Sequence, residues 1–134
     1  MNGGRTSKGR ENAVLYAILC YHDEAEVGAW PKAKDDAVIA KRRLVTDKLA
    51  ANGKLGPVAR LMPTTAATTI RSGREPVIID GPFAETKEQL LGFYVVDCAT
   101  LEEAIETARQ MGRGETGMFE VRPIRYFAPG SGAT

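Results

Sequence analysis

The sequence predicts a single α+β domain, in which two helices cover one face of a sheet. Three observations lead to this prediction. The 134 residues fit one domain, since a domain takes roughly 100 to 200 residues. Two apolar runs of strand length, 14–21 and 91–97, are typical of interior strands. The expected elements follow the order strand, helix, short strands, strand, helix, strand, which favours this plan over a doubly wound parallel sheet.

The first strand is expected at 14–21, where VLYAILCY is continuously apolar and aromatic. Because the run does not alternate, it fits a strand buried on both faces or lying at a subunit interface. The first helix is expected at 35–51 and ends at Asn52-Gly53, a typical helix stop. Its apolar residues, at approximately helical spacing among Lys and Arg, are Ala37, Val38, Ala40, Leu44, Val45, Leu49 and Ala50.

Three short segments, 58–61, 67–71 and 77–79, are separated by the turn-like stretches 63–65 and 72–74. They predict a meander or a hairpin. The run 91–97 then predicts the clearest interior strand.

The second helix is the best specified element. Thr100 predicts its N-cap, and Glu103 lies three residues later, as in a capping box. The apolar stripe before Gly112 consists of Leu101, Ala104, Ile105, Ala108 and Met111. The alternating stretch 118–124 predicts a last strand, which Pro123 confines to a sheet edge or a strand end.

This order of elements predicts a ferredoxin-like fold, whose second sheet face needs covering. A homodimer is therefore expected, with the two sheets packed face to face through 14–21 and 91–96. The domain is expected to span 13–126, between a flexible N-terminal extension, 1–12, and a flexible C-terminal tail, 127–134.

Composition excludes several functional classes. The formal net charge is +1 and the basic residues are scattered, so nucleic-acid binding is not expected. Cys20 and Cys98 lack metal-ligand spacing and predict buried free thiols. Neither a metal site nor a cofactor is expected. No apolar run reaches the roughly 18 residues of a membrane span, and we expect a cytoplasmic protein without membrane contact.

Two residues are candidates for catalysis. His22 is the only histidine and lies beside Asp23 and Glu24, where it could act as a general base or be an ordinary exposed loop histidine. Asp80 follows a predicted buried strand and precedes Gly81-Pro82. Its carboxylate is either a partly desolvated functional acid or the acceptor of an Asx-turn.

Three further residues are candidates for ligand binding. Arg71 could pair with Asp80 or hold an anionic ligand in its guanidinium fork. Tyr94 and its neighbour Phe93 point to opposite faces of one strand, so that one of them lines a cavity or a dimer interface. Arg122 on the last strand is expected to face the same interior. We therefore expect a pocket for a small polar or anionic ligand, bounded by His22, Arg71, Asp80 and Tyr94.

The chain resembles the DGPF group of the YCII-related family of small bacterial proteins. The resemblance covers roughly 13–124. It is strongest in DGPFAETKE at 80–88, and it is supported by YHDE at 21–24, ATTIR at 67–71, GFYVVD at 92–97 and EVRPI at 120–124. It implies a fold of the dimeric α+β barrel type.

The resemblance also implies two functional classes. The wider family suggests a catalytic histidine in the first helix and an aspartate before the last strand. The matching stretches here, 40–43 and 112–115, contain neither residue, so any chemistry falls to Asp80 with His22 or Arg71. DGPF-like domains also occur beside sigma factors. This implies an alternative role as a regulatory interaction module in transcription, although no helix-turn-helix pattern is present.

Overall fold

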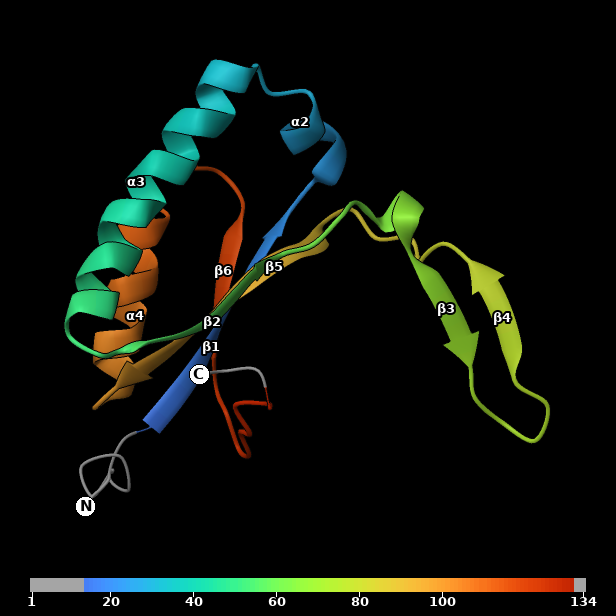
Figure 1. Cartoon of the computed structure of the whole chain (residues 1–134). Helices are drawn as coiled ribbons and strands as arrows, with labels where there is room; N and C mark the ends of the chain where they lie inside the picture. The colour runs from blue at the N-terminus through green and yellow to red at the C-terminus, as the bar shows by residue number, and fades with distance from the viewer. Residues whose placement is uncertain (1–13, 132–134) are drawn as a thin grey trace.

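The computed structural model describes residues 14–131 and shows an α+β fold (Figure 1). Four strands form one antiparallel sheet in the order β2-β5-β1-β6. Their bounds are Val14–His22 for β1, Leu55–Arg60 for β2, Gln89–Cys98 for β5 and Met118–Pro123 for β6. This order is compatible with the predicted ferredoxin-like plan, and Pro123 lies on an edge strand as expected.

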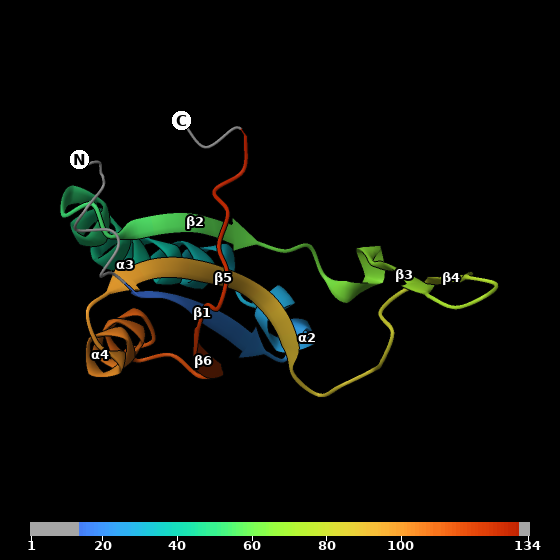
Figure 2. The ribbon, with the colours of Figure 1, turned by 90° about the horizontal axis from the view of Figure 1, so that it is seen from below.

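Two long helices cover the same face of the sheet, as Figures 1 and 2 show. They are α3, Lys32–Ala51, and α4, Leu101–Met111. A short helix, α2, spans Glu24–Gly28, and a 3₁₀ turn, η1, spans Thr64–Ala66. The core lies between β1, β5 and α4, and its buried residues are Tyr16, Ile18, Val96, Cys98, Ala104, Ala108 and Met111.

The predicted cap of α4 is confirmed, with one difference. Thr100 Oγ1 accepts a hydrogen bond of 3.1 Å from the Glu103 N–H. The Glu103 carboxylate accepts its return bond from the N–H of Ala99, also at 3.1 Å. In a capping box this bond would come from the N-cap residue itself. Both bonds satisfy N–H groups at the start of the helix.

The first predicted helix differs more from its prediction. It begins at Lys32, directly after Pro31, because the fixed φ of proline suits the entry to a helix. Leu44, expected in the apolar stripe, is 73% exposed. The short helix α2 was not predicted, and its N-cap is Asp23, whose carboxylate accepts from the N–H of Ala25 at 2.9 Å.

The other predicted short strands separate into two groups. The segment predicted at 58–61 joins the main sheet as β2, whereas β3, Thr68–Arg71, and β4, Val77–Asp80, form a two-stranded hairpin of their own. This hairpin extends away from the main body (Figure 2). Gly81 closes its base at φ +100°, a conformation that favours glycine. Its N–H donates to Ala67 O, and its carbonyl accepts from the Thr69 hydroxyl, each at 2.7 Å.

Within residues 14–131, no helix covers the second face of the sheet. In β1 every second residue is buried on the helix side, while Leu15, Ala17 and Leu19 are half-buried on the other face. The chain after β6 crosses that face (Figure 2), where Phe127 lies near Leu15 and Val95. The predicted extension 1–12 and the last residues of the predicted tail, 132–134, lie outside the described residues. No helix within 14–131 has the length and apolar character to cross a membrane.

Candidate functional site

A cavity of about 400 Å³ lies between α2, α3 and the helix-covered face of the sheet. One stripe of α3 forms its roof, with residues spaced three and four apart, as expected for one face of a helix. The stripe consists of Asp35, Val38, Ile39, Arg42, Arg43 and Thr46. We call this space the α3 cavity.

The floor of the α3 cavity is open because a glycine lies in the row of helix-facing side chains. Gly92 on β5 is paired with Cys20 on β1, and both residues line the cavity. A Cβ atom at Gly92 would lie 2.4 Å from the Ala59 carbonyl oxygen of β2. The close approach of β2 and β5 therefore requires glycine here, and the sheet has no side chain at this position to fill the space.

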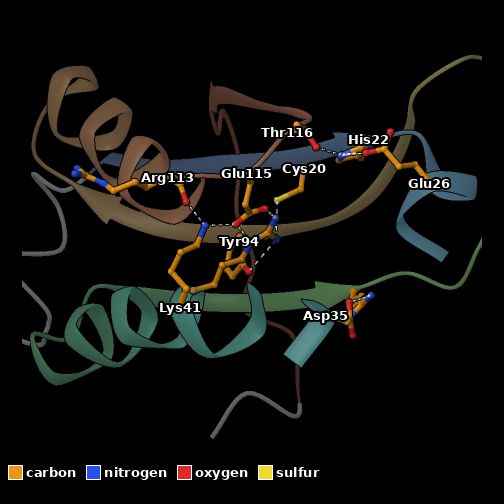
Figure 3. A network of polar contacts seen from close by, with 11 residues as sticks. Cys20, His22, Glu26, Asp35, Lys41, Tyr94, Arg113, Glu115 and Thr116 are labelled. Carbon is orange, nitrogen blue, oxygen red and sulfur yellow. Dashed lines mark hydrogen bonds and ion pairs between the residues drawn. The ribbon is translucent and has the colours of Figure 1, made fainter. Parts of the chain in front are cut away.

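A charged network closes one end of the cavity (Figure 3). The side chain of Glu115, only 3% exposed, accepts from Arg42 Nη2 at 2.5 Å and Nε at 3.1 Å. Lys41 Nζ lies 2.6 Å from the same carboxylate and donates to the carbonyl oxygen of Arg113. The third nitrogen of Arg42 lies 3.5 Å from the Tyr94 hydroxyl. The guanidinium is thereby held over the sheet by α3, β5 and the loop before β6.

Burial and charge together set the protonation of this network. Burial alone raises the pKa of Glu115, but the hydrogen bonds and charges of Arg42 and Lys41 outweigh it and hold that pKa below its usual value. Burial also acts against the charge of Arg42, yet its bonds to Glu115 and Tyr94 raise its pKa. Both side chains are charged at neutral pH. Burial raises the pKa of Cys20, which lies 4.0 Å from Arg42, to about 11, so this thiol remains protonated.

His22 lies at the other end of the cavity. Its Nδ1 accepts from the Asp23 N–H at 2.7 Å, so the neutral imidazole carries its proton on Nε2. That nitrogen lies 2.7 Å from Thr116 Oγ1 and 3.7 Å from a Glu26 oxygen. Gly117, at φ +94°, is packed so closely that a Cβ there would lie 2.6 Å from the imidazole ring. Both ring nitrogens therefore have partners within the protein.

Trp30 completes this end of the cavity. Its ring meets the imidazole of His22 edge to face at 5.8 Å, and Lys34 Nζ lies 4.6 Å from the ring centre. The indole Nε1 is enclosed and has no hydrogen-bond partner among residues 14–131. An enclosed N–H without a partner costs about 1–3 kcal/mol.

The structure brings together only part of the predicted site. His22 and Tyr94 both line the α3 cavity. Asp80 and Arg71 are exposed on the β3–β4 hairpin, where Asp80 is opposite Thr68 and Arg71 is opposite Val77, at the other end. Because this hairpin leaves the main sheet, neither residue is among those lining the cavity.

Arg122 faces away from the cavity too. On β6 it is paired with Ala17, in the row opposite to the core residues, and its guanidinium bonds to Glu120. The expectation that Arg122 shares an interior with Tyr94 is therefore wrong, because strand residues alternate between faces and Tyr94 packs on the helix side.

Sequence reasoning missed Arg42 and Glu115 as a pair. They occur in the two stretches, 40–43 and 112–115, that correspond to the expected catalytic residues of the resembled family. The sequence did indicate that the two stretches could attract each other, since 40–43 contains three basic residues and 112–115 ends in Glu115. The missing information was the position of Arg42 on the cavity side of α3, which its helical spacing from Asp35 and Val38 would have indicated.

Comparison with known proteins agrees with the resemblance. The model of the YCII-related domain matches residues 14–128. An uncharacterized protein of Rhizobium meliloti (strain 1021) is 53% identical over 120 residues, which cover 87% of this chain and 97% of that protein. The chain therefore belongs to the YCII-related domain family.

Proposed function

We propose that this protein binds a small organic acid with an apolar body in the α3 cavity. The observation that carries the proposal is the guanidinium of Arg42, held at one end of a cavity whose remaining lining is largely apolar. Ligand sites commonly combine an apolar lining with a few fixed polar groups, and they have volumes of roughly 300–1,000 Å³. At about 400 Å³ the α3 cavity lies within this range.

The charges around the cavity favour an anion. Glu115 is neutralised by Lys41 and Arg42 together, which leaves one positive charge in excess. Arg43 lines the cavity as well, and within residues 14–131 its side chain has no hydrogen bond or ion pair. A planar guanidinium suits a carboxylate because it can donate two parallel hydrogen bonds. The fork of Arg42 is already bonded to Glu115, so we assign the two parallel hydrogen bonds to Arg43, with the positive charge of Arg42 beside it.

Two observations favour binding over catalysis. The ring nitrogens of His22 are occupied by Asp23 and Thr116, so the imidazole has no free nitrogen with which to take a proton from a ligand. The Cys20 thiol, with a pKa of about 11, is a poor nucleophile at neutral pH. The assignment of His22 and Asp80 as a catalytic pair stays a prediction, and the α3 cavity offers it no support.

Thermal shift measurements test the proposal. Octanoate is compared with octanol and octylamine, which share its chain but replace the carboxylate by a neutral or a cationic group. A ligand at 100 times its dissociation constant stabilises a protein by about 2.7 kcal/mol. We expect octanoate to raise the melting temperature more than the other two compounds.

The variants sharpen this test. Arg43→Ala is expected to weaken the octanoate effect, whereas Arg109→Ala, on α4 and bonded to Glu106, should leave it unchanged. Equal shifts with all three compounds, or none with any, would count against an acid-binding site.

We also propose that the protein is a homodimer of the dimeric α+β barrel type. The sheet face that carries Ala17 and Leu19 is not covered by α3 or α4 (Figure 1), and a second copy would remove this apolar surface from water. Light scattering in dilute buffer tests the proposal, with a mass of twice 14.5 kDa as the expected result.

A further inference from the structure

The β3–β4 hairpin exposes large apolar side chains that have no place in the core. We call residues 61–83 the arm. Its four most exposed large apolar side chains are Met62 at 77%, Ile70 at 62%, Ile78 at 71% and Phe83 at 85%. The buried residues of the described chain all lie in β1, β5 and α4. No residue of the arm is therefore buried against the body that carries it.

One face of the arm concentrates this surface. Ile70 and Ile78 are directly opposite each other in the antiparallel pair, so their side chains lie on the same face. Thr68 and Asp80 are also paired and, two residues away, share that face. Val77, opposite Arg71, lies on the reverse face. That reverse face also carries the half-buried Ile79, and Val77 is 51% exposed, so the Ile70–Ile78 face exposes the larger apolar area and is the side on which the arm can dock.

The arm also lacks the support that a hairpin normally needs. Among the strands described in 14–131, β3 and β4 pair with no other and form a separate sheet of two. An isolated two-stranded hairpin is marginally stable in water and usually needs a third strand or a packed layer. Glu24 anchors its base by accepting from the Thr64 N–H at 3.0 Å, yet this bond fixes only the point where the arm leaves the body. A surface from elsewhere would supply the missing layer.

We propose that the arm packs its Ile70–Ile78 face against a second copy of this chain. The proposal rests on the homodimer proposed above and adds the surface that holds it together. In a two-fold dimer the same contact occurs twice, so each arm reaches the body of the other copy. A net charge of +1 does not oppose self-association.

The contact reaches the area of a specific dimer when Met62 and Phe83 are buried together with Ile70 and Ile78. A fully buried large apolar side chain corresponds to about 100 Å², from about 2.5 kcal/mol at 25 cal/mol per Å². With their present exposures, the four side chains of one arm offer about 300 Å². Two arms, and the equal areas that they cover on the partner bodies, bury about 1,200 Å² in total, which reaches the range of specific interfaces.

This inference gives the Asp80-Gly81-Pro82-Phe83 segment a role in assembly. Gly81 closes the base of the arm through its bonds to Ala67 and Thr69. Phe83 supplies the most exposed apolar side chain of the arm. Asp80 shares the docking face and is placed to contact the partner. The segment shapes the arm without lining the α3 cavity.

Hydrogen–deuterium exchange combined with light scattering tests the inference on the full chain. At concentrations where light scattering reports a dimer, we expect the amides of 68–71 and 77–80 to be protected, and to lose this protection on dilution to monomer. The double variant Ile70→Thr/Ile78→Thr keeps β-branched side chains and should weaken dimerisation at least tenfold. Val77→Thr, on the reverse face, is the matched control and should leave dimerisation unchanged.

The possible outcomes separate this inference from the proposed dimer. A wild-type protein that remains a monomer overturns both. A dimer in which the arm stays unprotected, or in which Ile70→Thr/Ile78→Thr dimerises like wild type, overturns the arm and keeps the dimer. An arm that becomes protected only when a sigma factor is added overturns the inference and supports a protein-interaction module instead.

Discussion

The two long helices cover the same sheet face, yet they use it differently. The eleven residues of α4 include four buried ones, Ala104, Thr107, Ala108 and Met111, whereas none of the twenty residues of α3 is buried. Beneath α4 the sheet is in contact with packed side chains. Beneath residues 35–46 of α3 it borders the cavity of about 400 Å³. One part of this face is thus packed against buried side chains, and the other part borders an open space.

The position of α3 above this space depends on contacts near its ends and on ion pairs. Toward its C-terminus, Val45 and Leu49 pack partly against the core. Nearer its start, Asp35 is paired with Arg60 of β2 at 3.1 Å. Between these contacts, Arg42 bonds to Glu115. Polar contacts can hold a helix over a cavity without filling it, which an apolar stripe cannot do.

The largest expected effect contrasts the two helices directly. Met111→Ala removes a fully buried side chain of α4 and should lower the free energy of unfolding by about 2–5 kcal/mol. Ile39→Ala, on the cavity side of α3 and 38% exposed, should cost about 1 kcal/mol or less, because it enlarges an existing space. Urea unfolding measures both values. Equal losses would show that α3 packs as tightly as α4.

The next effect concerns Glu115 and its dependence on pH. Its pKa is lowered in the folded protein, so its stabilising contribution is complete above the unfolded value of about 4.3. That contribution is lost as the pH falls through the lower folded pKa. Glu115→Gln should cost about 1.5–3 kcal/mol at pH 7.

The difference in unfolding free energy between wild type and Glu115→Gln should therefore shrink as the pH falls below about 4.3. Urea unfolding at a series of pH values measures it. A difference that stays constant down to pH 3 would mean that the pairing with Arg42 does not stabilise the charged carboxylate.

A smaller effect separates backbone strain from crowding near His22. Gly117 and Gly114 both have positive φ, at +94° and +78°. A Cβ at Gly117 meets the imidazole ring, whereas a Cβ at Gly114 has open space. Both substitutions to Ala place a side chain on a backbone of positive φ. Because of the added contact with the ring, Gly117→Ala should lower the free energy of unfolding by about 1 kcal/mol more than Gly114→Ala. Thermal unfolding of the two variants would show the same loss if the loop were free to move away from the ring.

The smallest effect contrasts the two thiols. Cys20 borders the cavity and Cys98 lies in the packed core, and burial raises the pKa of both. Iodoacetamide should modify Cys20 faster than Cys98 in the folded protein. Between pH 7 and 9 the Cys20 rate should rise about tenfold per pH unit without a plateau. A plateau near pH 8.5 would contradict the raised pKa.

The part of the sheet that packs against α4 was easier to predict from the sequence than the part that borders the α3 cavity. The apolar run of β1, the strand β5 and the capped, amphipathic α4 carry strong local signals, and each is confirmed with bounds within two residues. The start of α3 and the whole of α2 were missed, because a helix that covers a cavity needs no continuous apolar stripe.

The site was harder to predict because its contacts are distant in sequence. Arg42 and Glu115 are separated by 73 positions, and only the folded chain shows that they meet. The sequence favoured Asp80 as a site residue, since a carboxylate after an apolar strand suggests an active site. The short strand before it turned out to belong to an exposed hairpin, which the run Val77-Ile78-Ile79 alone could not reveal, because buried and exposed short strands can have the same apolar composition.

The most direct test of the central claim uses Trp30, the only tryptophan of the chain, which lines the α3 cavity. Octanoate is titrated while the emission of Trp30 is followed, in wild type, in Val38→Phe and in Leu44→Phe. Val38 lines the cavity, so its replacement by Phe places a larger side chain where the ligand is expected to lie. Leu44, 73% exposed on the same helix, is the control. We predict a saturable change in emission for wild type and Leu44→Phe, and its loss in Val38→Phe. An emission that stays constant in wild type, or a response that survives in Val38→Phe, would contradict a binding site beneath α3.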